Sequence, residues 1–154
     1  MPDKMEKVYL DTNLIIGFFK NLIRKKKKTG EDPEIIKFLA IHDEIKKFIS
    51  IFSIAEIIES LEEEFPSHAL TQDYILDLIE TLRNTIELEI IEDVKVSKNI
   101  INYTYLCRDV KDAIHIDICQ ASELWFITRD EDCGKVSKIY NKIMSERKFR
   151  KQFE

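Results

Sequence analysis

The chain has 154 residues, of which 44% are hydrophobic and 34% charged, with only three Gly and three Pro. This length and composition favour one folded domain over residues 1–154 and exclude disordered, collagen-like and low-complexity chains. Lys and Arg number 24 against 29 Asp and Glu, a formal net charge of -5. The overall field therefore does not attract nucleic acid or anionic membranes, and binding of a polyanion requires a local basic patch.

The cysteines and the apolar segments bear on the cellular compartment. Cys107, Cys119 and Cys133 show no CxxC spacing, which indicates neither a disulfide framework nor a zinc site and favours reduced thiols. The most apolar stretch, Leu14 to Phe19, is about a third of the length that crosses a bilayer, and no apolar leader segment is found. We expect a cytoplasmic protein with no membrane contact.

The chain begins with a strand and two helices. A β-type run over Lys7–Leu10 ends at Asp11, and apolar residues then recur at helical spacing over residues 14–22. Asp32 and Pro33 suit the N-cap and first position of a second helix. The sequence thus predicts two helices before the next strand.

The middle of the chain repeats the alternation of strand and helix. Lys47–Phe52 indicates a strand, and Ser53 with Glu56 has the form of a capping box that opens the following helix. Residues 70–83 carry one apolar helical face, and residues 86–91 alternate apolar and acidic side chains. That alternation is typical of a half-exposed strand, so we expect it near a sheet edge.

The last third contains the most apolar strand. A helix is predicted from the stripe Val96, Ile100, Ile101 and Tyr105, and Asp109 opens another that runs to about Ser122. Residues 124–128 form a nearly continuous apolar run, typical of a strand buried on both faces, and residues 135–149 show helical spacing, which leaves a fifth strand open. The whole pattern predicts an α/β three-layer sandwich with a central, mostly parallel sheet of four or five strands.

Acidic residues stand at one edge of this predicted sheet. Asp11 and Asp130 directly follow strands, and Glu56 and Asp112 lie in first turns of predicted helices. Because strand carboxyl ends and crossover-helix amino ends share a rim, we expect all of them to meet there. Meeting carboxylates repel one another, and a divalent cation relieves that repulsion. Oxygen ligands without a His or Cys cluster favour Mg²⁺ or Mn²⁺, which indicates metal-dependent phosphodiester hydrolysis.

Each acid also has a purely structural explanation. Glu56 would be the partner of Ser53 in the capping box, and Asp112 would stabilise the positive end of a helix capped by Asp109. An Asp directly after a strand also suits a turn. The placement of all these acids at one edge of the sheet is what favours a metal-binding, catalytic role over the structural explanations.

Segments in all parts of the chain resemble, in order, the motifs of the PIN domain family, which includes the VapC-type ribonuclease toxins. They are Val8–Asn13, Phe52–Glu56, Lys111–His115 and Phe126–Asp132. The resemblance implies a central parallel sheet and a Mg²⁺- or Mn²⁺-dependent endoribonuclease. In-line attack of water on RNA would leave a 5′-phosphate and a 3′-hydroxyl. Asp117 departs from the family, which usually has a small or apolar residue there.

The resemblance also implies roles for single residues and for partners. RNA would be the substrate, and a small antitoxin protein and a second copy of the chain would be partners, as for the toxin of a toxin–antitoxin pair. Two residues would give polar support, Asn13 and Thr128. The catalytic and metal-binding acids would be Asp11, Glu56, Asp112 and Asp130, with Asp132 as an extra ligand or water-positioning acid.

Several features leave alternatives open. Lys25, Lys26, Lys27 and Lys28 could hold RNA phosphates, or form a solvated helix end that suits the negative pole of the first helix. His115 could contact a phosphate, although a histidine satisfied locally on a helix face is commoner. The competing function is an RNA- or protein-binding module of the same fold without nuclease activity. A phosphatase that uses Asp11 as its nucleophile is a weaker alternative, because no second acid stands two residues after Asp11.

Overall fold

The structure is a computed structural model that describes residues 7–24, 32–129 and 131–154, with only the backbone of residues 131–134. Two predicted parts of the site, Asp130 and the run Lys25–Lys28, lie outside the described residues, as does the side chain of Asp132.

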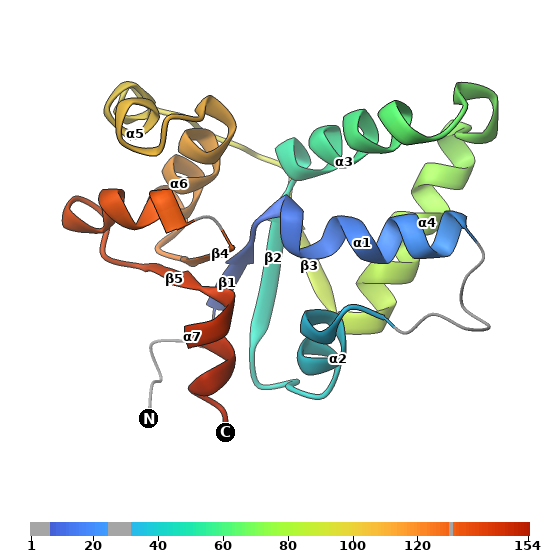
Figure 1. Cartoon of the computed structure of the whole chain (residues 1–154), viewed down its shortest axis with the longest axis horizontal. Helices are drawn as coiled ribbons and strands as arrows, with labels where there is room; N and C mark the ends of the chain where they lie inside the picture. The colour runs from blue at the N-terminus through green and yellow to red at the C-terminus, as the bar shows by residue number, and fades with distance from the viewer. Residues whose placement is uncertain (1–6, 25–31, 130) are drawn as a thin grey trace.

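A single parallel sheet forms the centre of the described structure (Figure 1). Its spatial order is β3-β2-β1-β4-β5, and each neighbouring pair is parallel. The predicted α/β fold with a mostly parallel sheet of four or five strands is confirmed, with five. The predicted edge position of the alternating strand is also correct, since β3 is an outer strand. The strands are β1 (Lys7–Leu10), β2 (Lys46–Ser50), β3 (Leu88–Ile91), β4 (Trp125–Thr128) and β5 (Ile143–Ser145).

Helices cover both faces of the sheet, which gives the three layers seen in Figure 1. One face carries α1 (Thr12–Ile23), α2 (Glu34–Ala40), α3 (Ile51–Glu64) and α4 (Gln72–Ile86). The other face carries α5 (Asn99–Cys107) and α6 (Val110–Ser122). Short 3₁₀ turns, η3 (Ser67–Ala69) and η4 (Glu131–Lys138), and the helix α7 (Glu146–Lys151) complete the described elements.

The central strand β1 separates the core into two halves. Val8 and Leu10 pack into the cluster under α1 to α4, whereas Tyr9 packs into the cluster under α5 and α6. All three side chains are fully buried, because successive strand residues point to opposite faces and both faces are covered. This central position places Asp11, the next residue, in the middle of the sheet's carboxyl edge.

The start of α3 corrects two predictions. The strand predicted over Lys47–Phe52 ends at Ser50, because the helix begins at Ile51. Ser50 is the N-cap, and its hydroxyl accepts from the Ser53 N–H at 3.3 Å while the Ser53 hydroxyl accepts from the Ser50 N–H at 3.1 Å. The predicted capping pair of Ser53 with Glu56 is therefore wrong. Glu56 lies one turn further along the helix, where it is not needed as a cap.

The prediction of one helix over residues 135–149 in the C-terminal segment is wrong. This segment contains η4, then the edge strand β5 paired with β4 through Phe126 and Ile143, then α7. The Ser145 hydroxyl caps α7 by accepting from the Lys148 N–H at 3.3 Å. Val136 and Tyr140 are buried at a spacing of four residues, and this spacing imitates a helix although the backbone between them does not continue as one.

Two other helix predictions differ from the structure in detail. The stripe predicted for α5 faces outward, with Ile101 60% and Tyr105 77% exposed, whereas Tyr103 and Cys107 are buried. Pro33, and not Asp32, occupies the N-cap position of α2.

The described residues also bear on the thiols and on membranes. Cys107 and Cys119 are both buried, on α5 and α6. Among the helices of the described ranges, none has the length and apolar character required to cross a bilayer.

Candidate active site

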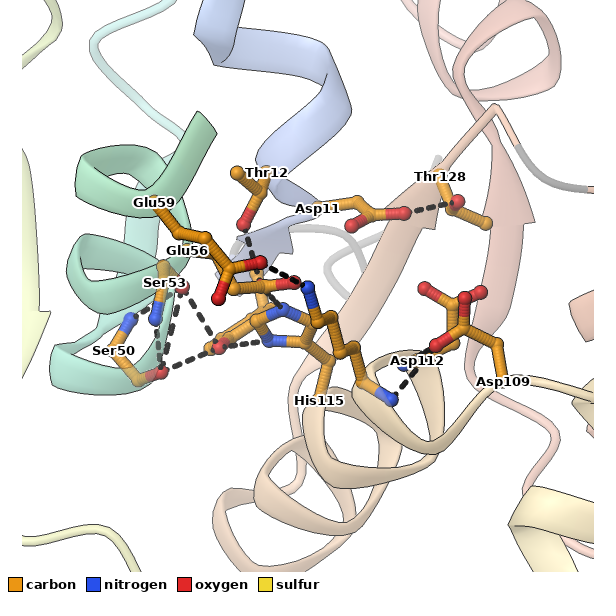
Figure 2. A network of polar contacts seen from close by, with 12 residues as sticks. Asp11, Thr12, Ser50, Ser53, Glu56, Glu59, Asp109, Asp112, His115 and Thr128 are labelled. Atoms are coloured by element: carbon orange, nitrogen blue, oxygen red, sulfur yellow. Dashed lines mark hydrogen bonds and ion pairs between the residues drawn. The ribbon is translucent and has the colours of Figure 1, made fainter. Parts of the chain in front are cut away.

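A polar pocket of about 390 Å³ opens at the carboxyl edge of the sheet. The start of α1 contributes Asp11 and Asn13, α3 contributes Glu56, and the start of α6 contributes Asp112. The structure thus brings Asp11, Glu56 and Asp112, three of the four predicted acids, to one pocket, where Figure 2 shows them on separate elements. The described residues do not include Asp130.

Asp11 is held where β1 passes into α1. Its backbone N–H donates to the Ile127 carbonyl at 3.0 Å, which ties the end of β1 to β4. Its side chain is 4% exposed and accepts from the Thr128 hydroxyl at 2.6 Å (Figure 2). Burial raises the pKa of Asp11 above its usual range, although the Thr128 hydrogen bond acts in the opposite direction. The predicted polar residue Thr128 is therefore in direct contact with the most buried acid of the pocket, and Asn13 lies exposed at its rim.

Glu56 is held by two donors on the same oxygen. The Thr12 hydroxyl donates to Glu56 Oε1 at 2.9 Å, and His115 Nε2 contacts Oε1 as well. Burial raises the pKa of Glu56, but the hydrogen bond and electrostatic attraction of His115, together with Thr12, outweigh it and lower the pKa overall. Glu56 is therefore an ionised carboxylate at neutral pH.

The amino end of α6 forms the opposite wall. The Asp109 carboxylate caps the helix by accepting from the backbone N–H groups of Lys111 at 2.8 Å and Asp112 at 3.2 Å. Asp112 itself is half-buried in the first turn. Lys111 Nζ donates to Glu59 Oε1 at 2.7 Å, so an ion pair joins α6 to α3 beside the pocket.

His115 is a residue of this region to which sequence reasoning gave no firm role. It is neither on an outer helix face nor at a phosphate-accessible position, since it is fully buried between Glu56 and Tyr9. The available signal was its spacing, three residues after Asp112, which places both on one side of α6. Its partners are 106 and 59 residues away in sequence, so no local pattern could identify them.

Asp117, the departure from the family pattern, has a structural explanation. It is 3% exposed and accepts from the Ser97 hydroxyl at 2.9 Å and from the Ser97 N–H. Asp117 thus fixes the turn that precedes α5 and does not line the pocket.

The donor types in the pocket fit a hard cation. Asp11, Glu56 and Asp112 offer carboxylate oxygens, which Mg²⁺ and Mn²⁺ prefer, and a cation would stabilise the buried Asp11 charge. As the side chains stand, no three His, Cys, Asp or Glu residues within the described ranges lie close enough to hold one ion together. The oxygen donors of the pocket are therefore of the type that binds Mg²⁺ or Mn²⁺, but the described side chains do not already surround a single ion position.

Comparison with known proteins identifies a family and a similar solved structure. The model of the PIN domain family matches residues 8–139. No curated protein matches the chain. Among solved structures, the chain is similar to a chain in the crystal structure of VapBC2 from Rickettsia felis bound to a DNA fragment from their promoter. The TM-score is 0.50 at 16% identity, over 90% of this chain and 98% of that chain. At this identity the likeness supports the fold.

Proposed function

The chain belongs to the PIN domain family, a family of nucleases, and on this premise we propose that it is a Mg²⁺- or Mn²⁺-dependent endoribonuclease. The observation that carries the proposal is the convergence of Asp11, Glu56 and Asp112 on one pocket at the carboxyl edge of the parallel sheet. These carboxylates would hold the metal. Asp130 and Asp132, which follow β4 in sequence, are proposed to complete the acidic set.

The residues around the pocket would have different roles in holding the metal-binding carboxylates. Thr128 keeps the buried Asp11 carboxylate in place, and Thr12 and His115 keep Glu56 ionised and oriented. A divalent cation, when bound, supplies stabilisation of the charge that develops on the phosphate and the leaving oxygen.

The charge of the pocket sets an order of binding. Of the 11 residues that line it, six are acidic, and Lys111 is the one Lys or Arg among them. Such a surface repels an RNA phosphate until a cation neutralises part of the charge, so metal should bind before substrate. Lys111, at the rim, is the proposed contact to the incoming RNA backbone, and Lys25, Lys26, Lys27 and Lys28 are proposed as additional phosphate contacts.

We further propose that the protein is the toxin of a toxin–antitoxin pair, with a small antitoxin protein and a second copy of this chain as partners. The support is the fold shared with the VapBC2 structure, which contains a DNA fragment from their promoter. The alternative is a binding module of the same fold without nuclease activity.

One experiment separates the candidate functions. Purified protein is incubated with end-labelled single-stranded and structured RNAs in Mn²⁺, Mg²⁺ or EDTA, beside the Asp11→Asn variant. We expect internal cleavage that requires metal, leaves 5′-phosphate ends and is lost in Asp11→Asn. A gel shift without new ends would instead establish the binding module, and release of inorganic phosphate from RNA ends would establish a phosphatase.

A further inference from the structure

His115 sits in the interior with a polar partner at each ring nitrogen. Its ring is surrounded by Tyr9, Phe52 and Phe126, with centroids 5.4, 5.1 and 6.1 Å away. Nδ1 lies 2.6 Å from the Tyr9 hydroxyl, and Nε2 contacts Glu56 Oε1. A buried imidazole is costly unless both nitrogens are satisfied, so this contact set defines its orientation.

The Tyr9 hydroxyl connects His115 to the start of α3. It lies 2.7 Å from the Ser50 hydroxyl and 3.1 Å from the Ser53 hydroxyl. These two serines form the capping box and are labelled in Figure 2. Burial raises the pKa of Tyr9 far above its usual range, so the phenol keeps its proton. The network therefore runs without a break from the cap of α3 through β1 and α6 back to Glu56 on α3.

The chemistry of these groups fixes where the proton of His115 lies. The contact joins Nε2 to a carboxylate oxygen, and a carboxylate oxygen accepts, so the hydrogen between them belongs on Nε2. If the ring is neutral, Nδ1 accepts from Tyr9. If the ring is charged, Nδ1 donates to Tyr9, whose own proton then goes to a serine hydroxyl. In both charge states the Nε2–H group donates to Glu56 Oε1.

We propose that His115 is a positioning residue for Glu56, and that Tyr9 sets the orientation of His115. Two donors on Oε1, Thr12 and His115, fix the Glu56 carboxylate and leave Oε2 as the oxygen that serves the cation. This inference rests on the proposed metal-dependent function. In this proposal, Tyr9 on β1 and His115 on α6 orient Glu56, a metal ligand on α3. Residues that hydrogen-bond to a metal ligand commonly orient it in this way.

The test measures Mn²⁺ binding without RNA, by electron paramagnetic resonance of the free ion. His115→Leu removes the donor and should weaken Mn²⁺ binding about tenfold or more. His115→Gln can place an amide N–H near the position of Nε2, so it should recover most of the affinity. Tyr9→Phe keeps the ring but frees Nδ1 and should weaken binding by a smaller factor. His42 follows α2 and its ring lies 4.1 Å from the Phe38 ring, away from the pocket. His42→Leu is therefore the matched control and should bind Mn²⁺ as wild type does.

Nitrogen-15 NMR of the metal-free protein gives a second readout. We expect a protonated Nε2 in wild type, and a mixture of tautomers in Tyr9→Phe. The proposal is overturned if wild type carries no proton on Nε2, or if His115→Leu, folded by circular dichroism, binds Mn²⁺ like wild type. In the latter case the proposed function survives. Absence of Mn²⁺ binding by the wild type itself would overturn the proposed function as well, which separates the two failures.

Discussion

The hydrogen bond from Thr128 to Asp11 provides the sharpest test of how the buried acid is held. Thr128→Val keeps the shape of the side chain and removes the hydroxyl that donates to Asp11 Oδ2 at 2.6 Å. Both residues are buried, at 2% and 4% exposure, and a buried hydrogen bond to a charged group contributes about 1.5–3 kcal/mol. For a chain of this length, that loss corresponds to a decrease of roughly 3–12 °C in the thermal midpoint at neutral pH.

The pH dependence of this loss has a defined sign. Burial raises the pKa of Asp11 above 3.8, so the unfolded chain releases this proton at lower pH than the folded protein. The Asp11 charge therefore reduces stability as pH rises from 3.8 through the folded pKa, and its effect is constant above that. Asp11→Asn should abolish this contribution. When Asp11 is protonated, the hydrogen bond is neutral and the effect of Thr128→Val should be smaller, about 0.5–1.5 kcal/mol.

A double-mutant cycle by urea unfolding measures the coupling directly. Thr128→Val is compared in the wild type and in Asp11→Asn, with Thr128→Ser as the control that keeps the hydroxyl. The expected coupling is about 1 kcal/mol or more, the difference between a charged and a neutral hydrogen bond. An equal cost of Thr128→Val in both backgrounds would show that the hydroxyl does not stabilise the Asp11 charge, and the reasoning would fail.

Three other predictions concern metal, catalysis and RNA. Mn²⁺ at 100 times its dissociation constant should raise the stability of wild type by about 2.7 kcal/mol in differential scanning fluorimetry but leave Asp11→Asn nearly unchanged, because the cation binds only the folded site. Glu56→Gln should fold normally and cleave RNA about a hundredfold or more slowly in a gel assay. Thr71→Ala, which removes the cap of α4, should instead cost about 1 kcal/mol of stability and keep activity. Equal cleavage by Glu56→Gln and wild type would remove Glu56 from the site. In fluorescence anisotropy with Asp11→Asn as the inactive background, Lys111→Met should weaken RNA binding and reduce its salt slope by about one, whereas an unchanged slope would assign Lys111 to its ion pair with Glu59 alone.

The parts of the fold that the sequence predicts are those fixed by local pattern. The bounds of β1 are predicted correctly because Lys7–Leu10 is a short β-type run that ends at an acid. The meeting of Asp11, Glu56 and Asp112 at one pocket follows from topology alone, since parallel strands with helical crossovers place these chain positions at one edge.

The features that the sequence did not predict depend on a choice between alternative capping residues or on contacts between residues far apart in the sequence. Ser50 and Ser53 form the capping box in place of Ser53 and Glu56, because a serine can satisfy the reciprocal N–H as well as a glutamate can. The three-residue strand β5 exists through its pairing with β4, and its own sequence has too little length to show a period. The two partners of His115 are brought to it only by the finished fold.

The central place of β1 has a consequence for the order in which the molecule is made. Its residues pair on one side with β2, through Val8 and Lys47, and on the other with β4, through Val8 and Trp125. During synthesis from the N-terminus, the pairing with β2 becomes possible early, while the second edge of β1 stays open until β4, which lies more than a hundred residues after β1, has emerged. A nascent chain at that stage presents an unpaired strand edge, the kind of surface that invites aggregation or chaperone binding. It also lacks Asp112, His115 and Thr128, so the first half of the polypeptide cannot assemble the acidic pocket while it is still on the ribosome.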